Sequence, residues 1–84
     1  MEQTFVRVTA EFDTEGNLYP RSLVWEDGCT YEIDRILDLR TAASQKHGGQ
    51  GDRYTVRIRG QIRYLFFERG PGCGAVGRWF VEKP

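Results

Sequence analysis

Two stretches of this chain alternate apolar and polar residues with a period of two. In Thr4–Phe12 an apolar side chain occupies every even position from Val6 onward, and in Arg53–Arg59 tyrosine, valine and isoleucine alternate with polar residues. Successive side chains of a β-strand point to opposite faces, so each stretch can bury one face and keep the other in water. The alternation predicts half-buried strands at both places and constrains the chain to a β-rich fold.

Turn residues set off four further extended segments. An Asp-Gly pair follows Trp25, which is a strong short-range hairpin signal, and glycines gather in 48–51 and 70–77. Pro20 has no backbone donor, so its segment is expected to be an edge strand or a bent strand. The four segments are Leu18–Trp25, Tyr31–Arg40, Ile62–Glu68 and Arg78–Glu82.

The segment Tyr31–Arg40 fits two periodicities. As a strand it places Ile33 and Leu39 on one side with Arg35 as an exception, whereas as a helix it groups Ile33, Ile36 and Arg40. The preceding Asp-Gly turn closes a hairpin at this point, which favours the strand. Residues 41–45 are compatible with one short helical turn, and 41–52 as a whole predicts a surface loop.

A chain of 84 residues is one small domain, and its eleven aromatic residues (13%) supply the core. A domain of this size buries only about 60% of its unfolded surface. Aromatic side chains bury about 150–250 Å² each and compensate for the short length. Five or six short strands joined by tight turns predict an all-β fold, with residues 1–84 forming a single small antiparallel β-barrel.

The formal net charge is zero, but its distribution is uneven. Residues 1–38 contain nine acids and three bases, a net of −6, whereas residues 39–84 contain three acids and nine bases, a net of +6. Two interpretations stay open: the halves neutralise each other within one barrel, or the C-terminal half presents a basic face.

The chain carries no targeting or membrane signal that we recognise. No apolar run approaches the about 18 residues of a membrane helix. The first residues, Met1–Arg7, lack the basic start and apolar core of a secretory signal. We therefore expect a cytoplasmic protein without a membrane partner, and two free thiols in a reducing compartment.

Candidates for catalysis and metal binding are few. Cys29, His47 and Cys73 are the soft ligands, and their spacing is unlike that of structural zinc sites. The acidic pairs at 26–27 and at 34 and 38 are explained by a turn and by a wetted strand face. Gly48–Asp52 lacks the Lys-Ser/Thr pair of a phosphate-binding loop. An enzyme would need a polar pocket near those three ligands, so we expect no enzyme, no metal and no cofactor.

Arginine and aromatic residues concentrate in the hairpin 53–68. Barrels that bind nucleic acids combine basic grooves with aromatic platforms. The alternative is that arginine stems cover apolar surface while their charged ends reach water. Trp25 and Trp79 are expected in the core. The candidate binding residues are Arg53, Arg57, Arg59, Arg63 and Tyr64.

The register of this hairpin decides which residues share a face. A three-residue loop pairs Ile58 with Ile62, builds one wholly apolar face and leaves Leu65 on the face with the arginines. A two-residue loop, with Arg57 opposite Tyr64, is the alternative. Burying a large apolar side chain is worth about 1.5–3 kcal/mol, against about 0.2–1 kcal/mol for a cross-strand pair. These magnitudes favour the three-residue loop.

Five aromatic segments over about residues 23–82 resemble a family of small bacterial proteins of unknown function. More distantly, they are similar to a domain appended to Y-family DNA-polymerase-like proteins. The resemblance implies an SH3-like barrel and DNA-related partners, and it brings no catalytic residues. The segments that carry it are Trp25–Gly28, Tyr31–Asp38, Arg53–Arg57, Tyr64–Glu68 and Arg78–Glu82.

The sequence thus predicts an all-β, SH3-like barrel of five or six strands that serves as a non-enzymatic binding module. A protein or peptide partner is expected. The alternative is weak nucleic-acid binding, with DNA as the target, through the arginine and aromatic face. The oligomeric state is left open.

Overall fold

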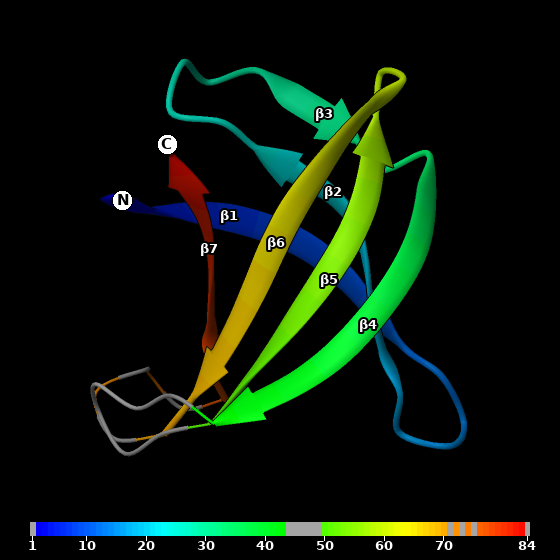
Figure 1. The fold of residues 1–84 in the computed structure, drawn as a ribbon, viewed down its shortest axis with the longest axis vertical. Coiled ribbons are helices and arrows are strands. Elements are labelled where there is room, and N and C mark those ends of the chain that lie inside the picture. Colours follow the sequence, from blue (N-terminus) through cyan, green and yellow to red (C-terminus); the bar gives the residue numbers. More distant parts are fainter. Residues whose placement is uncertain (1, 44–49, 71, 73, 75, 84) are drawn as a thin grey trace.

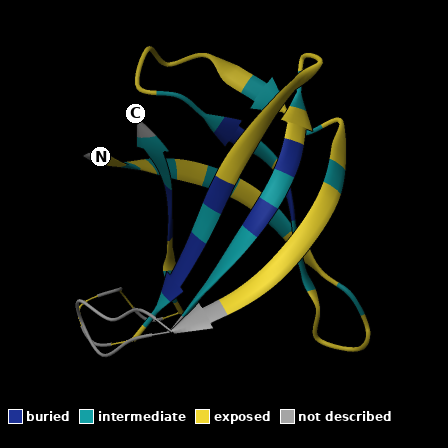
Figure 2. Cartoon of the chain, in the orientation of Figure 1, coloured by how far each residue is buried: buried dark blue, intermediate teal, exposed yellow. Residues whose placement is uncertain are grey.

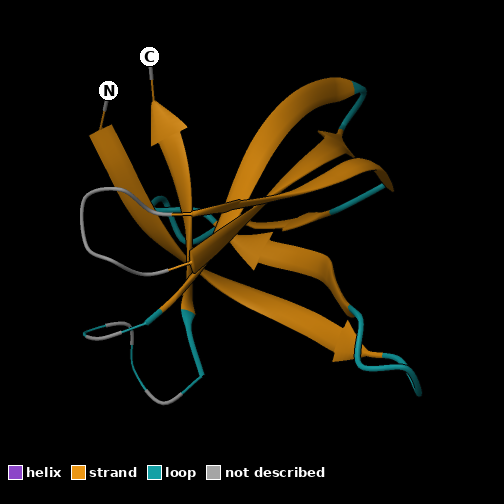
Figure 3. Ribbon diagram, turned by 60° about the horizontal axis from the view of Figure 1, so that its bottom comes forward, coloured by secondary structure: helices purple, strands orange, loops and turns teal. Residues whose placement is uncertain are grey.

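Seven β-strands make up the computed structural model, which describes residues 2–43, 50–70, 72, 74 and 76–83. Within these residues there is no helix (Figure 3). The all-β prediction is therefore confirmed at the level of class. The strands are β1 (Glu2–Phe12), β2 (Leu18–Val24), β3 (Thr30–Glu32), β4 (Arg35–Ala43), β5 (Gln50–Ile58), β6 (Gln61–Arg69) and β7 (Arg78–Lys83).

The strands form one antiparallel sheet in the order β3-β2-β1-β7-β6-β5-β4. The sheet curls strongly, so that β4, β5 and β6 cross one side of the molecule and β1 and β2 the other (Figure 1). The N-terminal strands β1–β3 and the C-terminal strands β5–β7 therefore occupy different parts of the sheet, joined through the pairing of β1 with β7.

The number of strands differs from the predicted five or six because the segment Tyr31–Arg40 is divided. It is extended, as preferred, but it breaks between Glu32 and Arg35 and contributes to two strands. Each strand pairs with a different part of the sheet: β3 with β2, and β4 with β5. The break lets the chain leave one edge of the sheet at β3 and continue at the other edge as β4.

The break brings the two edges of the sheet together. The backbone N–H of Ile33 donates to the carbonyl of Arg21 on β2 at 2.9 Å. The next N–H, of Asp34, donates to the carbonyl of Arg57 on β5 at 2.8 Å. The edge strands β3 and β4 nevertheless form no ladder with each other in the described residues. The result is a curled half-barrel.

Two predictions about loops are wrong in part. Thr41–Ala43 belongs to β4, so the helical turn proposed at 41–45 is absent there, and its last two residues lie outside the described part of the chain. Gln50–Asp52 likewise belongs to β5 and pairs with β6. The hairpin from β4 to β5 is therefore longer than the polar, glycine-rich composition of 41–52 indicated.

Pro20 lies in a bent strand, as predicted. The register of β1 with β2 shifts by one residue between Thr9 and Ala10, where Pro20 enters the ladder, and Arg21 is the extra residue. The ladder from β2 to β3 begins only at Ser22. Pro20 therefore has no partner on β3 to which a backbone N–H would have to donate.

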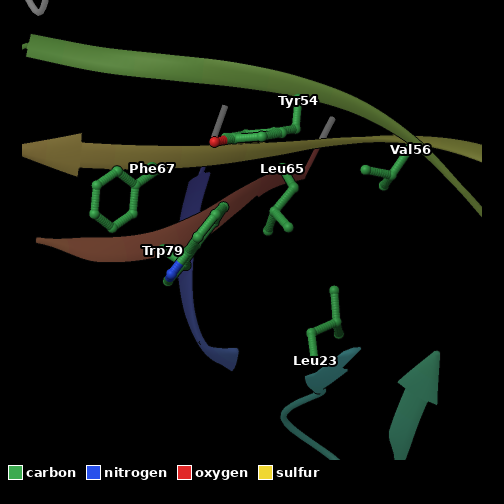
Figure 4. Packing of buried hydrophobic residues seen from close by; sticks show 6 residues of the cluster. All are labelled: Leu23, Tyr54, Val56, Leu65, Phe67 and Trp79. Carbon is green, nitrogen blue, oxygen red and sulfur yellow. The ribbon is translucent and has the colours of Figure 1, made fainter. Parts of the chain in front are cut away.

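The core lies inside the curl and consists mainly of large side chains from β5, β6 and β7 (Figure 4). Trp79 packs against the rings of Phe67 and Tyr54, with centroids 4.7 and 5.4 Å away. The buried members of the core come from both sides of the half-barrel. They are Leu23, Tyr54, Val56, Leu65, Phe67 and Trp79.

Tyr54 links the two sides of the half-barrel. Its hydroxyl donates to the carbonyl of Leu18 on β2 at 2.6 Å, across the interior from β5. Burial, with a smaller effect of the nearby Asp52 carboxylate, raises the pKa of Tyr54 to about 12. The neutral phenol is therefore the form that the fold stabilises.

Candidate binding groove at the tip of the β5–β6 hairpin

The turn between β5 and β6 has two residues, Arg59 and Gly60, so the predicted three-residue loop is wrong. Ile58 pairs with Gln61, and the alternative pairing of Arg57 with Tyr64 is not formed either, because Arg57 pairs with Ile62. Both turn residues have positive φ, 51° for Arg59 and 76° for Gly60. Two consecutive positive φ angles are the mark of a tight hairpin turn whose twist matches that of its strands.

This register exchanges the two faces of β6 relative to the prediction. Leu65, which was expected beside the arginines, lies opposite Tyr54 and is fully buried. Tyr64 and Phe66 instead share the outer face with Arg53. The reason lies in β7, which pairs with β6 so that Leu65 and Phe67 meet core residues of β7. The contacts with this third strand outweigh the hairpin energies that favour the three-residue loop.

The structure brings three of the five predicted site residues together. Arg53, Arg57 and Tyr64 lie on the outer face, where the guanidinium carbon of Arg53 is 5.1 Å from the ring centroid of Tyr64. Arg63 lies on the inner face, opposite Val56. Arg59 lies in the turn, 5.2 Å from the ring centroid of Tyr31 on β3.

A groove of about 1080 Å³ runs along the free edge of β6 at the hairpin tip, and residues of both faces of the sheet line it. The ladder between β6 and β7 has its last register pair at Leu65 and Val81. Beyond that pair the two strands diverge (Figure 1), and residues 61–64 of β6 are exposed (Figure 2). The groove lies where the curled sheet has opened.

The floor of the groove is the core of the half-barrel. The buried side chains of Leu23, Val56 and Leu65 line it, together with Val81 of β7. Leu23 on β2 stands apart from Val56 and Leu65 (Figure 4). An apolar floor with a polar rim is the usual composition of a ligand site.

Residues far apart in the sequence form the rim. Trp25 and Tyr31 come from the β2–β3 hairpin, and Arg59, Arg63 and Tyr64 from the β5–β6 hairpin. Sequence reasoning identified the second group and missed the first, because it assigned Trp25 to the core. Trp79 is buried as predicted, but Trp25 is only half-buried. The contact of Arg59 with Tyr31 depends on tertiary structure and leaves no signal in local sequence.

The arginines of the hairpin tip form no ion pair in the described residues. We call Arg53, Arg57, Arg59 and Arg63 the tip arginines. None of the four ion pairs recorded there involves them. The Nε atom of Arg53 is buried without a hydrogen-bond partner. The guanidinium of Arg63 donates to the side-chain oxygen of Gln61 at 2.6 Å. Glu82 is the one acidic side chain that lines the groove.

The candidates for catalysis and metal binding lie elsewhere. Cys29 is exposed, and its N–H donates to Asp27 at 2.9 Å in the β2–β3 turn. Asp34 and Asp38 are exposed, and a hydrogen bond from Arg40 lowers the pKa of Asp38. His47 and Cys73 lie outside the described residues. In the described part of the chain no three acidic, cysteine or histidine side chains gather into a metal-binding group, and no helix is present that could cross a bilayer.

Comparison with known proteins adds no relative to this picture. The sequence matches no protein-family model, and the search found neither a curated protein nor a solved structure that is similar to it.

Proposed function

We propose that this protein is a non-enzymatic binding module whose groove holds an extended peptide segment of a partner protein. The single observation that carries the proposal is the opening of the sheet beyond Leu65. There an apolar groove lies beside residues 61–64 of β6, which pair with no residue of β7 in the described part of the chain. Domains that bind peptides by strand addition use the same two components: backbone pairing at a sheet edge, and pockets for alternate side chains.

The wider identity of the module is also a proposal. The half-barrel supports, in coarse outline, the SH3-like barrel that the resemblance to a family of small bacterial proteins implies. The exposed thiol of Cys29 supports a reducing, cytoplasmic setting.

Weak DNA binding is the second candidate function, and one observation favours it. On the outer face, Arg53 and Arg57 lie beside Tyr64 and Phe66 without ion-pair partners in the described residues. Unpaired arginines beside aromatic rings are suited to single-stranded nucleic acid. The peptide proposal ranks first because the groove has an apolar floor and about twice the volume of the concavity beside Arg40, Arg53 and Phe66, which is about 520 Å³.

Chemical-shift mapping of the full-length protein tests both candidates. The isotope-labelled chain is titrated with blocked ten-residue peptides in which valine alternates with serine, glutamate or lysine, and separately with a ten-residue oligothymidylate. We expect peptide-induced shifts at groove residues such as Leu23, Tyr31 and Leu65. The proposal is overturned if none of the three peptides shifts them. It is also overturned if the oligonucleotide alone binds, with an affinity that falls steeply with salt.

A pair of matched variants locates the site. Ile62 lines the groove and is 50% exposed, whereas Phe12 on β1 is 66% exposed and lies outside the groove. Ile62→Ser is expected to weaken peptide binding, and Phe12→Ser is expected to leave it unchanged. Equal effects of the two substitutions would place the contact elsewhere and contradict the proposal.

A further inference from the structure

We infer that the occupant of the groove is a segment with alternating apolar and acidic side chains, which adds to the sheet as a strand beside residues 61–64 of β6. This inference rests on the proposed function, that the groove binds a peptide. It adds the backbone conformation of the partner and the sign of its charge.

The backbone of β6 supplies the first argument. Residues 61–64 pair with β5 on one side, but no register pair joins them to β7 on the other in the described residues. In an antiparallel ladder alternate residues direct their N–H and C=O groups to the same side. Part of the polar backbone of this segment therefore faces the groove without a strand partner. Four residues of strand span about 14 Å, which is enough for a short added strand.

The lining of the groove supplies the second argument. Side chains of an added strand point alternately to the two faces of the sheet. Those on the inner face meet the apolar floor of Leu23, Val56 and Val81, so they are expected to be apolar. Those on the outer face meet Tyr64 and the guanidinium of Arg53, which lines the groove and lies over that ring.

Charge supplies the third argument. Three of the tip arginines, Arg53, Arg59 and Arg63, line the groove without an ion-pair partner in the described residues, against one acid, Glu82. Arginine forms planar, directional contacts with carboxylates, so acidic side chains on the partner would neutralise this rim. Complementary charge also rejects segments of the wrong sign.

A second copy of this chain is a poorer occupant. Antiparallel pairing of β6 with β6 across a two-fold axis at Arg63 would place the Arg63 side chains of the two chains directly opposite each other. Like charges placed opposite each other on paired strands are destabilising. The unpaired edge therefore selects a partner of opposite charge.

The affinities of the three peptides for the protein test the inference. By fluorescence anisotropy at low salt, the peptide with glutamate is expected to bind about tenfold more tightly than the one with serine, which corresponds to about 1.4 kcal/mol. The peptide with lysine is expected to bind more weakly than both. A glutamate peptide that is N-methylated at alternate residues, in either phase, tests backbone pairing. One of the two phases should lose binding.

Paired substitutions separate groove charge from total charge. Arg53→Gln, which removes the guanidinium that lies over Tyr64 on the outer face, is expected to lose most of the preference for glutamate over serine. Arg7→Gln is the control, because Arg7 is exposed on β1 and lies outside the groove. Neither variant removes a buried side chain.

The outcomes distinguish this inference from the proposed function. If the serine and glutamate peptides bind equally at the groove, or if neither N-methylated peptide loses binding, the inference fails and the peptide-binding module stands. If none of the peptides binds, both fail. A concentration-dependent dimer in sedimentation that excludes the peptides would make a second copy the occupant, which also overturns the inference.

Discussion

The two ends of the β5–β6 hairpin differ in whether their charged side chains form ion pairs. At the closed end, where β7 covers β6, Asp52 and Glu68 have side chains only 12% and 8% exposed, and each has an arginine partner. Arg69 lies 2.8 Å from Asp52, and Arg78 lies 3.3 Å from Glu68. At the open end, where the hairpin tip extends beyond β7, Arg57, Arg59 and Arg63 form no ion pair in the described residues.

The difference separates stability from recognition within the same two strands. A carboxylate that is removed from water must be paired, because an unpaired buried charge is strongly destabilising. An exposed guanidinium stays hydrated and costs the fold little. The ion pairs of the closed end therefore contribute to stability, whereas the arginines of the open end can bind acidic groups of a partner. The predictions below test this division.

The largest effect is expected at Gly77, which precedes β7 at the closed end. A Cβ atom there would lie 2.5 Å from Cζ of Phe67 and 2.7 Å from the carbonyl oxygen of Glu68. Since a core ring and a backbone atom would both have to move, Gly77→Ala should lower the free energy of unfolding by about 2–4 kcal/mol. Urea denaturation measures the loss.

Gly60 in the hairpin turn is the control at the open end. Its φ is 76°, and a Cβ atom would meet nothing within 4 Å. Gly60→Ala should cost only the strain of the left-handed backbone, about 1 kcal/mol. A loss at Gly60 as large as that at Gly77 would contradict the claim that the closed end carries the stability.

The second prediction compares one arginine from each end. Arg78→Gln leaves the buried carboxylate of Glu68 without its ion pair and should cost about 1–2 kcal/mol, because the group cannot recover full hydration. Arg63→Gln at the open end should change stability by less than about 0.5 kcal/mol. Thermal unfolding of both variants checks this. Equal losses would show that the tip arginines are structural.

Much of the fold could be predicted from the chain, because strand alternation is a local property. The strands around Val6 and Val56 were predicted from their period of two, and the β2–β3 turn from Asp27 and Gly28. The hairpin register could not be predicted, because it depends on β7. Leu65 faces the core since it pairs with Val81, a residue 16 positions away.

Part of the candidate site could likewise be predicted from the sequence, and part of it could not. The arginines and Tyr64 were identified from the composition of one hairpin. The groove itself requires Leu23, Tyr31 and Val81, which reach it only through the curl of the sheet. The separation of acidic and basic halves was visible in the sequence. Its consequence, that the tip arginines form no ion pair in the described residues, depends on the strand order.

The third prediction concerns Tyr54, which lies at the boundary between the two ends. Tyr54→Phe leaves the carbonyl of Leu18 without its donor and should cost about 1 kcal/mol at neutral pH. The pKa of this tyrosine is about 12 in the folded state, against 10.0 for the unperturbed group. Between these values the unfolded chain loses the proton and the folded chain keeps it.

Stability of the wild-type protein should therefore fall as the pH rises from 10 toward 12. Urea midpoints at pH 8.5 and pH 11 measure the fall, and Tyr54→Phe is expected to show a smaller one. The same fall in both proteins would assign it to other groups and contradict the pKa argument.

The smallest effect is expected at Arg59, and its sign is opposite. The φ of 51° places this side chain in the left-handed region, which asparagine tolerates better than arginine, and Asn-Gly is the preferred pair for such a turn. Arg59→Asn should raise the free energy of unfolding by about 0.5 kcal/mol, because the relief of about 1 kcal/mol of backbone strain outweighs the loss of an exposed cation–π contact with Tyr31 of about 0.5 kcal/mol. The variant should also bind the glutamate peptide more weakly. Arg59 would then carry backbone strain without contributing to stability, which supports its role in the binding groove. Loss of stability in Arg59→Asn would show instead that the contact with Tyr31 holds the two hairpins together, and the open end would then be structural as well.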